Sequence, residues 1–261
     1  MDFFSDLFRQ LPLYLLSLPV VLVALSVHES AHGYVAYKLG DPTARNLGRI
    51  TLNPVKHFDV IGFLCMVLLH FGWAKPVPII TRNFKKPRRD MAITGAAGPI
   101  SNLLLALIHL IVLRIVMIFV IKQFSGDVVA FWMNDSFTAS PAFIATALIV
   151  YILYMGVVMN VVLAIFNLIP IPPFDGSRIF YVFLPNKWYF GIMKYERYIM
   201  IGFFALLLIV NRLPNAYNPL YIIETYVIEG LLKLFGFGPN TDGGLVLTTM
   251  QYYLYRLVGL V

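Results

Sequence analysis

The sequence predicts an all-α polytopic membrane protein with about 4-6 transmembrane helices. Of the 261 residues, 59% are hydrophobic and only 13% are charged, and the mean hydropathy is +0.79. Such a chain has too little polar surface to cover a water-soluble globule of its size. Uncharged runs approach the ~20 residues that a helix needs to cross a bilayer, and they lie at 11–27, 60–74, 91–113, 136–174 and 198–211. The lipid bilayer is therefore the first predicted partner.

The basic residues lie between the apolar runs. The formal net charge of +7 could indicate binding to nucleic acid, but the cations do not share one face of a soluble domain, so we expect no nucleic-acid partner. The positive-inside rule instead places two basic segments, residues 38–56 and 75–89, in the cytoplasm. The N-terminus is then outside, and the first span, about 11–39, ends at the cytoplasmic side.

Two short features are expected beside the spans. The apolar run 60–74 lies between two cytoplasmic loops and is too short to cross the membrane and return, which predicts a re-entrant segment. The stretches "GRITL" (48–52) and "KPVPIIT" (75–81) have the composition of strands and predict a short membrane-associated β-hairpin.

The long uncharged run 136–174 cannot be one straight span. Pro170, Pro172 and Pro173 interrupt helical hydrogen bonding, so the chain is expected to unwind between about 167 and 175 and to leave backbone groups facing a cavity. A last span is expected at 198–211. We expect residues 1–213 to form an integral membrane core and residues 214–261 to form interfacial or membrane-associated helices.

The first span ends in an ionisable cluster, "HESAH". His28 and His32 lie about one helical turn apart, so both imidazoles can bind one zinc ion, while Glu29 projects beside them and is suited to take a proton from water. The alternative is that these are polar residues that pack between helices. Ionisable side chains in a span are costly, however, and this favours a functional site.

A hydrolytic zinc site normally has three protein ligands. Among the acidic residues, Asp175 alone is expected at the end of a broken intramembrane helix, at about the depth of His28, and we expect it to be the third ligand of one Zn²⁺ per chain. His57 and Asp59 remain open as alternative ligands or as partners of a histidine N–H. Asn102 could line a substrate path or pack between helices.

At this point the motifs resemble a known family. "HESAH" and "NLIPIPPFDG" are similar to the two hallmark motifs of the site-2 protease family of intramembrane zinc metalloproteases, peptidase family M50. The surrounding "LGDPTA", "GRITLNPVKH", "GWAKPVP" and "GPISN" are similar to the compact bacterial and archaeal members, which have no PDZ or CBS domain. The resemblance covers about residues 11–184.

The resemblance implies a site and an activity. Zinc would be held by His28, His32 and Asp175, with Glu29 as general base and acid and with Asn167 assisting the oxyanion. The substrates would be single-pass membrane proteins, cleaved within their transmembrane segments in regulated intramembrane proteolysis. The protein would be a multi-pass protein of a prokaryotic cell (inner) membrane, with its active site toward the cytoplasm.

Two other classes of function compete with this one. A cation-binding transporter would also contain a broken helix, but it should carry a second copy in an inverted repeat, and the sequence shows none. A catalytically silent zinc-binding membrane scaffold would not need Glu29. No oligomeric state follows from the sequence.

Overall fold

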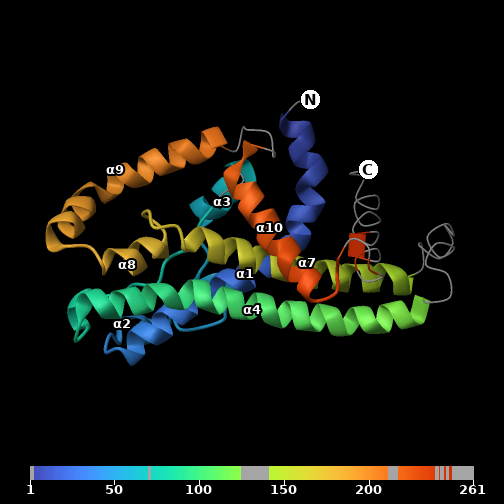
Figure 1. The fold of residues 1–261 in the computed structure, drawn as a ribbon, viewed down its shortest axis with the longest axis horizontal. Helices are drawn as coiled ribbons and strands as arrows, with labels where there is room; N and C mark the ends of the chain where they lie inside the picture. Colours follow the sequence, from blue (N-terminus) through green and yellow to red (C-terminus); the bar gives the residue numbers. More distant parts are fainter. Residues whose placement is uncertain are drawn as a thin grey trace. The chain divides into compact units, whose positions relative to one another are not determined.

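The computed structural model describes residues 3–69, 72–124, 141–210 and 217–238 and the single positions 241, 244, 247 and 248. Every regular element in these residues is helical (Figure 1), which confirms the all-α prediction. The longest helices are α1 (Phe3–Lys38), α4 (Pro87–Phe124), α7 (Pro141–Asn167) and α9 (Asn186–Val210). The shorter ones are α2 (Thr43–Asn46), α3 (Val60–Leu69), α8 (Asp175–Tyr181) and α10 (Pro219–Leu234), with 3₁₀ turns at Pro54–Lys56 and Thr81–Asn83.

Three described helices are long and apolar enough to cross a membrane. Their spanning segments are Leu11–Lys38, Pro87–Lys122 and Ile144–Asn167, so the chain is an integral membrane protein. The last expected span lies in the second half of α9, where the described apolar part, 198–210, is only about 20 Å long against ~30 Å of hydrocarbon. A total of 4-6 spans therefore stays a prediction.

The predicted β-hairpin is wrong for the described residues. Residue 48 lies in a turn and residues 50–52 form bends, while residues 75–80 belong to neither a helix nor a strand. Pro76 and Pro78 have no N–H to offer a neighbouring strand. The amide of Val77, between them, donates to a side-chain carboxylate instead. Within residues 75–80 the amides of Val77 and Ile80 donate to side-chain carboxylates, and that of Lys75 donates to the main-chain carbonyl of His57.

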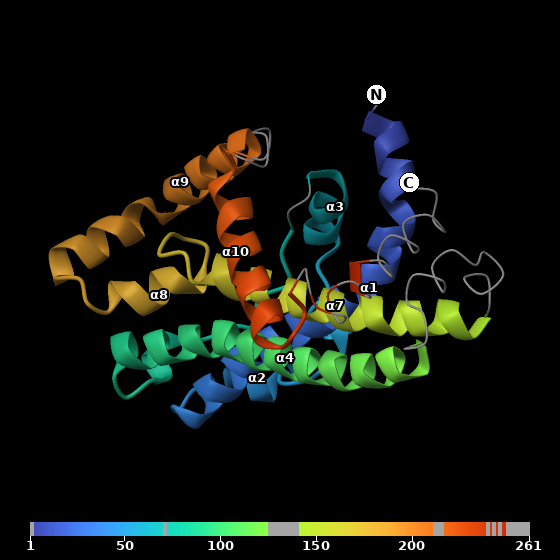
Figure 2. The ribbon, with the colours of Figure 1, turned by 45° about the vertical axis from the view of Figure 1, so that its right-hand side comes forward.

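The apolar segment 60–74, which was expected to be re-entrant, leaves the chain near His57 and returns to it. It contains α3, and Figure 2 shows the chain running to this helix and returning beside it. The N–H of Lys75 donates to the carbonyl of His57 over 2.8 Å, which joins the two ends. Along the way, Gly62 packs so closely that an added Cβ would lie 2.1 Å from the carbonyl oxygen of Trp73. Entry of this segment into the bilayer stays a prediction.

The expected break in the long apolar run is confirmed. α7 ends at Asn167, residues 168–174 form turns, and α8 begins at Asp175. The start of α8 packs directly against the chain that leaves α7, because a Cβ at Gly176 would lie 2.3 Å from the carbonyl oxygen of Leu168. Only glycine fits there, and this close return fixes the position of the adjacent aspartate.

The chain divides into two compact units. The first comprises Met1–Val21, Leu105–Met159 and Thr225–Val261, and the second comprises Leu22–Leu104 and Asn160–Glu224. All of the predicted site residues belong to the second unit. The domain boundary expected after residue 213 lies outside the described residues, so the division at 213 and the interfacial role of the C-terminal helices stay predictions.

Candidate metal centre

α1 places the two histidines of the HExxH motif on one face. Both side chains are buried, with His28 4% and His32 6% exposed. Their rings lie almost perpendicular, and their Nε2 atoms are 3.0 Å apart. The four-residue spacing of the motif thus gives the paired imidazoles that the sequence predicts.

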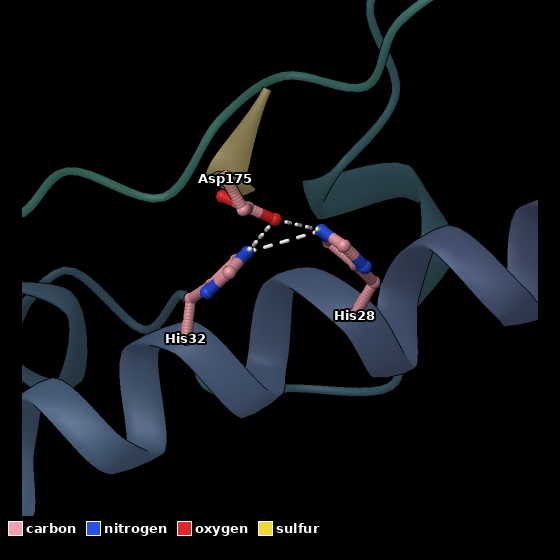
Figure 3. A group of neighbouring side chains, drawn as sticks. All are labelled: His28, His32 and Asp175. Carbon is pink, nitrogen blue, oxygen red and sulfur yellow. Dashed lines mark hydrogen bonds and ion pairs between the residues drawn. The ribbon is translucent and has the colours of Figure 1, made fainter. Parts of the chain in front are cut away.

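Asp175 completes a triangle of ligand atoms with these histidines. As the first residue of α8, it directs Oδ2 to 3.1 Å from the Nε2 atoms of both His28 and His32. Figure 3 shows the two imidazoles rising from α1 and converging on the carboxylate. The structure therefore brings Asp175 to two histidines that lie more than 140 positions earlier in the sequence.

A hydrogen-bond chain fixes the tautomer of His28. The side-chain amide of Asn102 donates from Nδ2 to Asn160 Oδ1 over 2.8 Å and toward the carbonyl of Ala24. Its Oδ1 is therefore the acceptor that faces His28 Nδ1, so His28 carries its proton on Nδ1. The lone pair on Nε2 then points into the triangle.

His32 is held in the same tautomer. Its Nδ1 donates to the main-chain carbonyl of Thr94 over 2.7 Å, which leaves the Nε2 lone pair facing His28 and Asp175. With both imidazoles neutral, two nitrogen lone pairs and one carboxylate oxygen thus converge. Such a set of acceptors suits a metal cation, and a histidine N–H fixed by an outer acceptor is the usual support of a metal ligand.

One face of α4 closes the site. Thr94, Gly98 and Asn102 are spaced by four residues, so they lie on the same side of the helix. Gly98 lies against the imidazoles, because an added Cβ would be 2.5 Å from His28 Cε1 and 2.5 Å from His32 Nε2. A glycine is therefore needed at this position to leave room for the two rings.

The donor set fits a zinc ion. A tetrahedral zinc ion with bonds of about 2.0–2.1 Å separates its ligand atoms by about 3.3 Å. The three separations between the ligand atoms here are 3.0, 3.1 and 3.1 Å. A small outward shift of each side chain would therefore accommodate the ion. Two neutral imidazoles and a carboxylate are also the ligands that zinc takes in hydrolytic sites.

The two predicted catalytic side chains lie outside this triangle. Glu29 is half-buried, and its Oε2 accepts a hydrogen bond of 2.8 Å from the amide of Val77. Asn167 is the last residue of α7, and its Nδ2 donates to the carbonyl of Leu163 over 2.9 Å. Neither role is tested by these contacts, so both stay predictions.

The residues left open as alternative ligands lie elsewhere. His57 donates from Nε2 to the carbonyl of Thr51, and Asp59 accepts from the amide of Gly62 at the start of α3. Within the described part of the chain, the metal-ligand group contains His28, His32 and Asp175. His57 and Asp59 therefore support the loop rather than the cluster.

Sequence reasoning missed the residues that α4 contributes. The stretch "GPISN", which begins at Gly98 and ends at Asn102, contributed only to the family resemblance, and Asn102 was left open between a substrate path and helix packing. The signal that could have identified it is a four-residue repeat of Thr, Gly and Asn within an apolar helix, because a buried asparagine needs polar partners.

Comparison with known proteins gives a consistent result. A model of "Peptidase family M50" matches residues 17–210. The chain is 36% identical over 203 residues to "Putative zinc metalloprotease YwhC" of Bacillus subtilis (strain 168), covering 77% of this chain and 84% of that protein. It is 26% identical over 161 residues to "Putative zinc metalloprotease Rip2" of Mycolicibacterium smegmatis (strain ATCC 700084 / mc(2)155), covering 59% of this chain and 52% of that protein. No solved structure matches the chain.

The family match covers well over half of the chain, and both motifs that carried the resemblance lie within it. The relative from Bacillus subtilis exceeds 30% identity over most of both proteins. The chain therefore belongs to peptidase family M50, the site-2 protease family, and is a metallopeptidase with zinc as its cofactor.

Proposed function

We propose that this metallopeptidase is an intramembrane endopeptidase that cleaves transmembrane segments of single-pass membrane proteins. The observation that carries the proposal is the position of the ligands. His28 and His32 belong to Leu11–Lys38, a helix segment long and apolar enough to span a membrane. A hydrolytic site built on such a segment acts where soluble peptides do not reach.

In this proposal His28, His32 and Asp175 hold the zinc ion. When bound, zinc supplies Lewis-acid chemistry, polarising the scissile carbonyl and lowering the pKa of a water toward ~7. Glu29 follows His28 directly, so its carboxylate projects from the same turn of α1. It would accept a proton as general base and later deliver that proton to the leaving amine as general acid.

Asn167 is the proposed oxyanion donor. Its amide nitrogen has two hydrogens, and one of them bonds to Leu163 within its own helix. The second makes no hydrogen bond within the described residues. It could therefore donate to the oxyanion of a tetrahedral intermediate without breaking the contact that orients the side chain.

The proposed location is a prokaryotic cell (inner) membrane, with the site toward the cytoplasm. Lys38, at the end of α1, lies about 9 Å along the helix axis beyond His32, and basic residues continue through Arg45 and Arg49. By the positive-inside rule this end of the helix is cytoplasmic. Cleavage near it would release a cytoplasmic fragment, as regulated intramembrane proteolysis requires.

The test uses the full chain, purified in lipid nanodiscs, as wild type and as Glu29→Gln. The measurements are zinc per chain and the rate of cleavage of a single-span model substrate. We expect the variant to keep its zinc and to lose about 10²–10⁴-fold in rate. Glu229→Gln, which alters an exposed acid paired with Lys233, should cleave as the wild type does. Cleavage that survives in Glu29→Gln would refute the assignment of the base.

A further inference from the structure

Residues 72–80, here called the strap, belong to neither a helix nor a strand. One side chain and one main-chain carbonyl from earlier in the chain hold the first half of the strap. The guanidinium Nη2 of Arg49 donates to the carbonyls of Lys75 and Pro76, over 2.7 and 3.3 Å. The amide of Lys75 donates to the carbonyl of His57. These contacts take the place of a strand partner and fix the path of the strap up to Pro76.

The other end of the strap is fixed by Asp41. This side chain is fully buried, and its Oδ2 accepts the amide of Ile80 over 2.6 Å, while Oδ1 accepts from Thr43 and Asn83. Asp41 follows α1 directly through Gly40, whose φ of +111° ends the helix in a left-handed turn. The end of the strap is therefore tied to the end of the helix that carries the HExxH motif.

Between these two anchors, one amide faces the catalytic motif. Pro76 and Pro78 have no N–H, so Val77 alone can donate from the centre of the strap. Val77 is 7% exposed, and its N–H reaches Glu29 Oε2 over 2.8 Å. The other carboxylate oxygen, Oε1, accepts no hydrogen bond within the described residues.

We propose that the strap is the positioning element of the general base, with the Val77 N–H holding Glu29 so that Oε1 faces the reaction. This inference rests on the proposed function of Glu29. A free glutamate side chain has several rotamers, and fixing one of them costs conformational entropy. A hydrogen bond from a rigidly anchored amide sets that orientation before substrate binds, which is the condition for efficient proton transfer.

Three sequence motifs that lie outside the metal triangle share one role in this proposal, which is to hold the strap in position. "LGDPTA" supplies Asp41, "GRITLNPVKH" supplies Arg49 and His57, and "GWAKPVP" supplies the strap with its Pro–Val–Pro centre. In the structure Arg49 and Asp41 bind the strap on either side of Val77, and the N–H of Val77 makes the hydrogen bond to Glu29. Val77, Arg49 and Asp41 are therefore positioning residues that act through Glu29.

The test replaces only the Val77 amide by an ester, with the α-hydroxy acid of valine introduced during cell-free synthesis of the full chain into nanodiscs. The side chain is retained and the N–H is lost. We expect kcat to fall by about 10–100-fold, with KM within about twofold and zinc per chain unchanged. The matched control is an ester at Ile79, whose N–H has no partner within the described residues and whose kcat should equal that of the wild type.

A kcat of the Val77 ester equal to that of the wild type would overturn the inference. So would a change in KM alone, which would make the strap a substrate-binding element, or a loss of zinc, which would make its role structural. Glu29→Gln is measured in the same series. If Glu29→Gln is inactive while the Val77 ester is fully active, only the role of the strap fails; if Glu29→Gln is active, the proposed function fails.

A second variant loosens the strap at a distance from the base. Arg49→Ala removes both contacts to the strap carbonyls, and we expect kcat to fall several-fold, about threefold to tenfold, with zinc retained. Arg49→Lys keeps one cationic donor for the carbonyl of Lys75 and should recover part of that loss. Equal kcat in Arg49→Ala and the wild type, or no recovery in Arg49→Lys, would contradict the proposal.

Discussion

Gly98→Ala should weaken zinc binding while adding only one heavy atom to the chain. The added Cβ would lie 2.5 Å from both His28 Cε1 and His32 Nε2, whereas non-bonded heavy atoms approach to about 3.5 Å. The imidazoles must therefore retreat by about 1 Å. Metal sites tolerate changes of about 0.2 Å in ligand distance, so we expect zinc affinity to fall at least about 100-fold, or about 2.7 kcal/mol.

The assay is competition for zinc against a chelator of known affinity, with the full chain in detergent and with thermal unfolding recorded in parallel. Gly191→Ala is the matched control, because no heavy atom lies within 4 Å of a Cβ at that position of α9. Its zinc affinity should equal that of the wild type. A Gly98→Ala protein that binds zinc as tightly as the wild type would show that α4 does not close the metal site.

Three further predictions test the surroundings of the site. Asn102→Leu removes the acceptor that fixes the His28 tautomer, and zinc affinity should fall by about 10–100-fold in the same competition assay; unchanged affinity would contradict the role of this acceptor. Burial alone would raise the pKa of Asp41, but its hydrogen bonds hold that pKa below the usual range. The ionised Asp41 carboxylate therefore stabilises the folded protein fully above about pH 4, and this stabilisation is lost as the pH falls through the lowered pKa of Asp41. The difference in Tm between wild type and Asp41→Asn should accordingly shrink at low pH. A difference in Tm that stays constant with pH would contradict the stabilising role of the Asp41 carboxylate. Removing zinc with a chelator should lower the Tm of the wild type, because three converging acceptors then face one another, and it should leave the Tm of Gly98→Ala almost unchanged.

The three side chains of the candidate metal centre could be predicted from the sequence because local rules fix their positions. His28 and His32 share a helix face by spacing alone. The Pro-rich break before Asp175 ends α7 and starts α8, so an acid at that break is held at a helix terminus inside the apolar region. The all-helical fold follows from the same apolar runs.

The remaining features depend on contacts that no local pattern encodes. Asn102 supports a histidine 74 positions away, and Val77 reaches Glu29 over 48 positions. The β-hairpin was predicted from composition, but prolines removed two amides and a carboxylate on α1 took the third. Side-chain acceptors compete with a strand partner for the same N–H groups, and only the tertiary fold decides which one binds.

The central claim is that His28, His32 and Asp175 together hold one zinc ion. It is tested most directly by zinc stoichiometry and zinc X-ray absorption on the purified wild type and on Asp175→Ala. We predict one zinc per wild-type chain, coordinated by two imidazoles and by oxygen, and binding at least about 100-fold weaker in Asp175→Ala. An Asp175→Ala protein that keeps the stoichiometry and the coordination of the wild type would contradict the account.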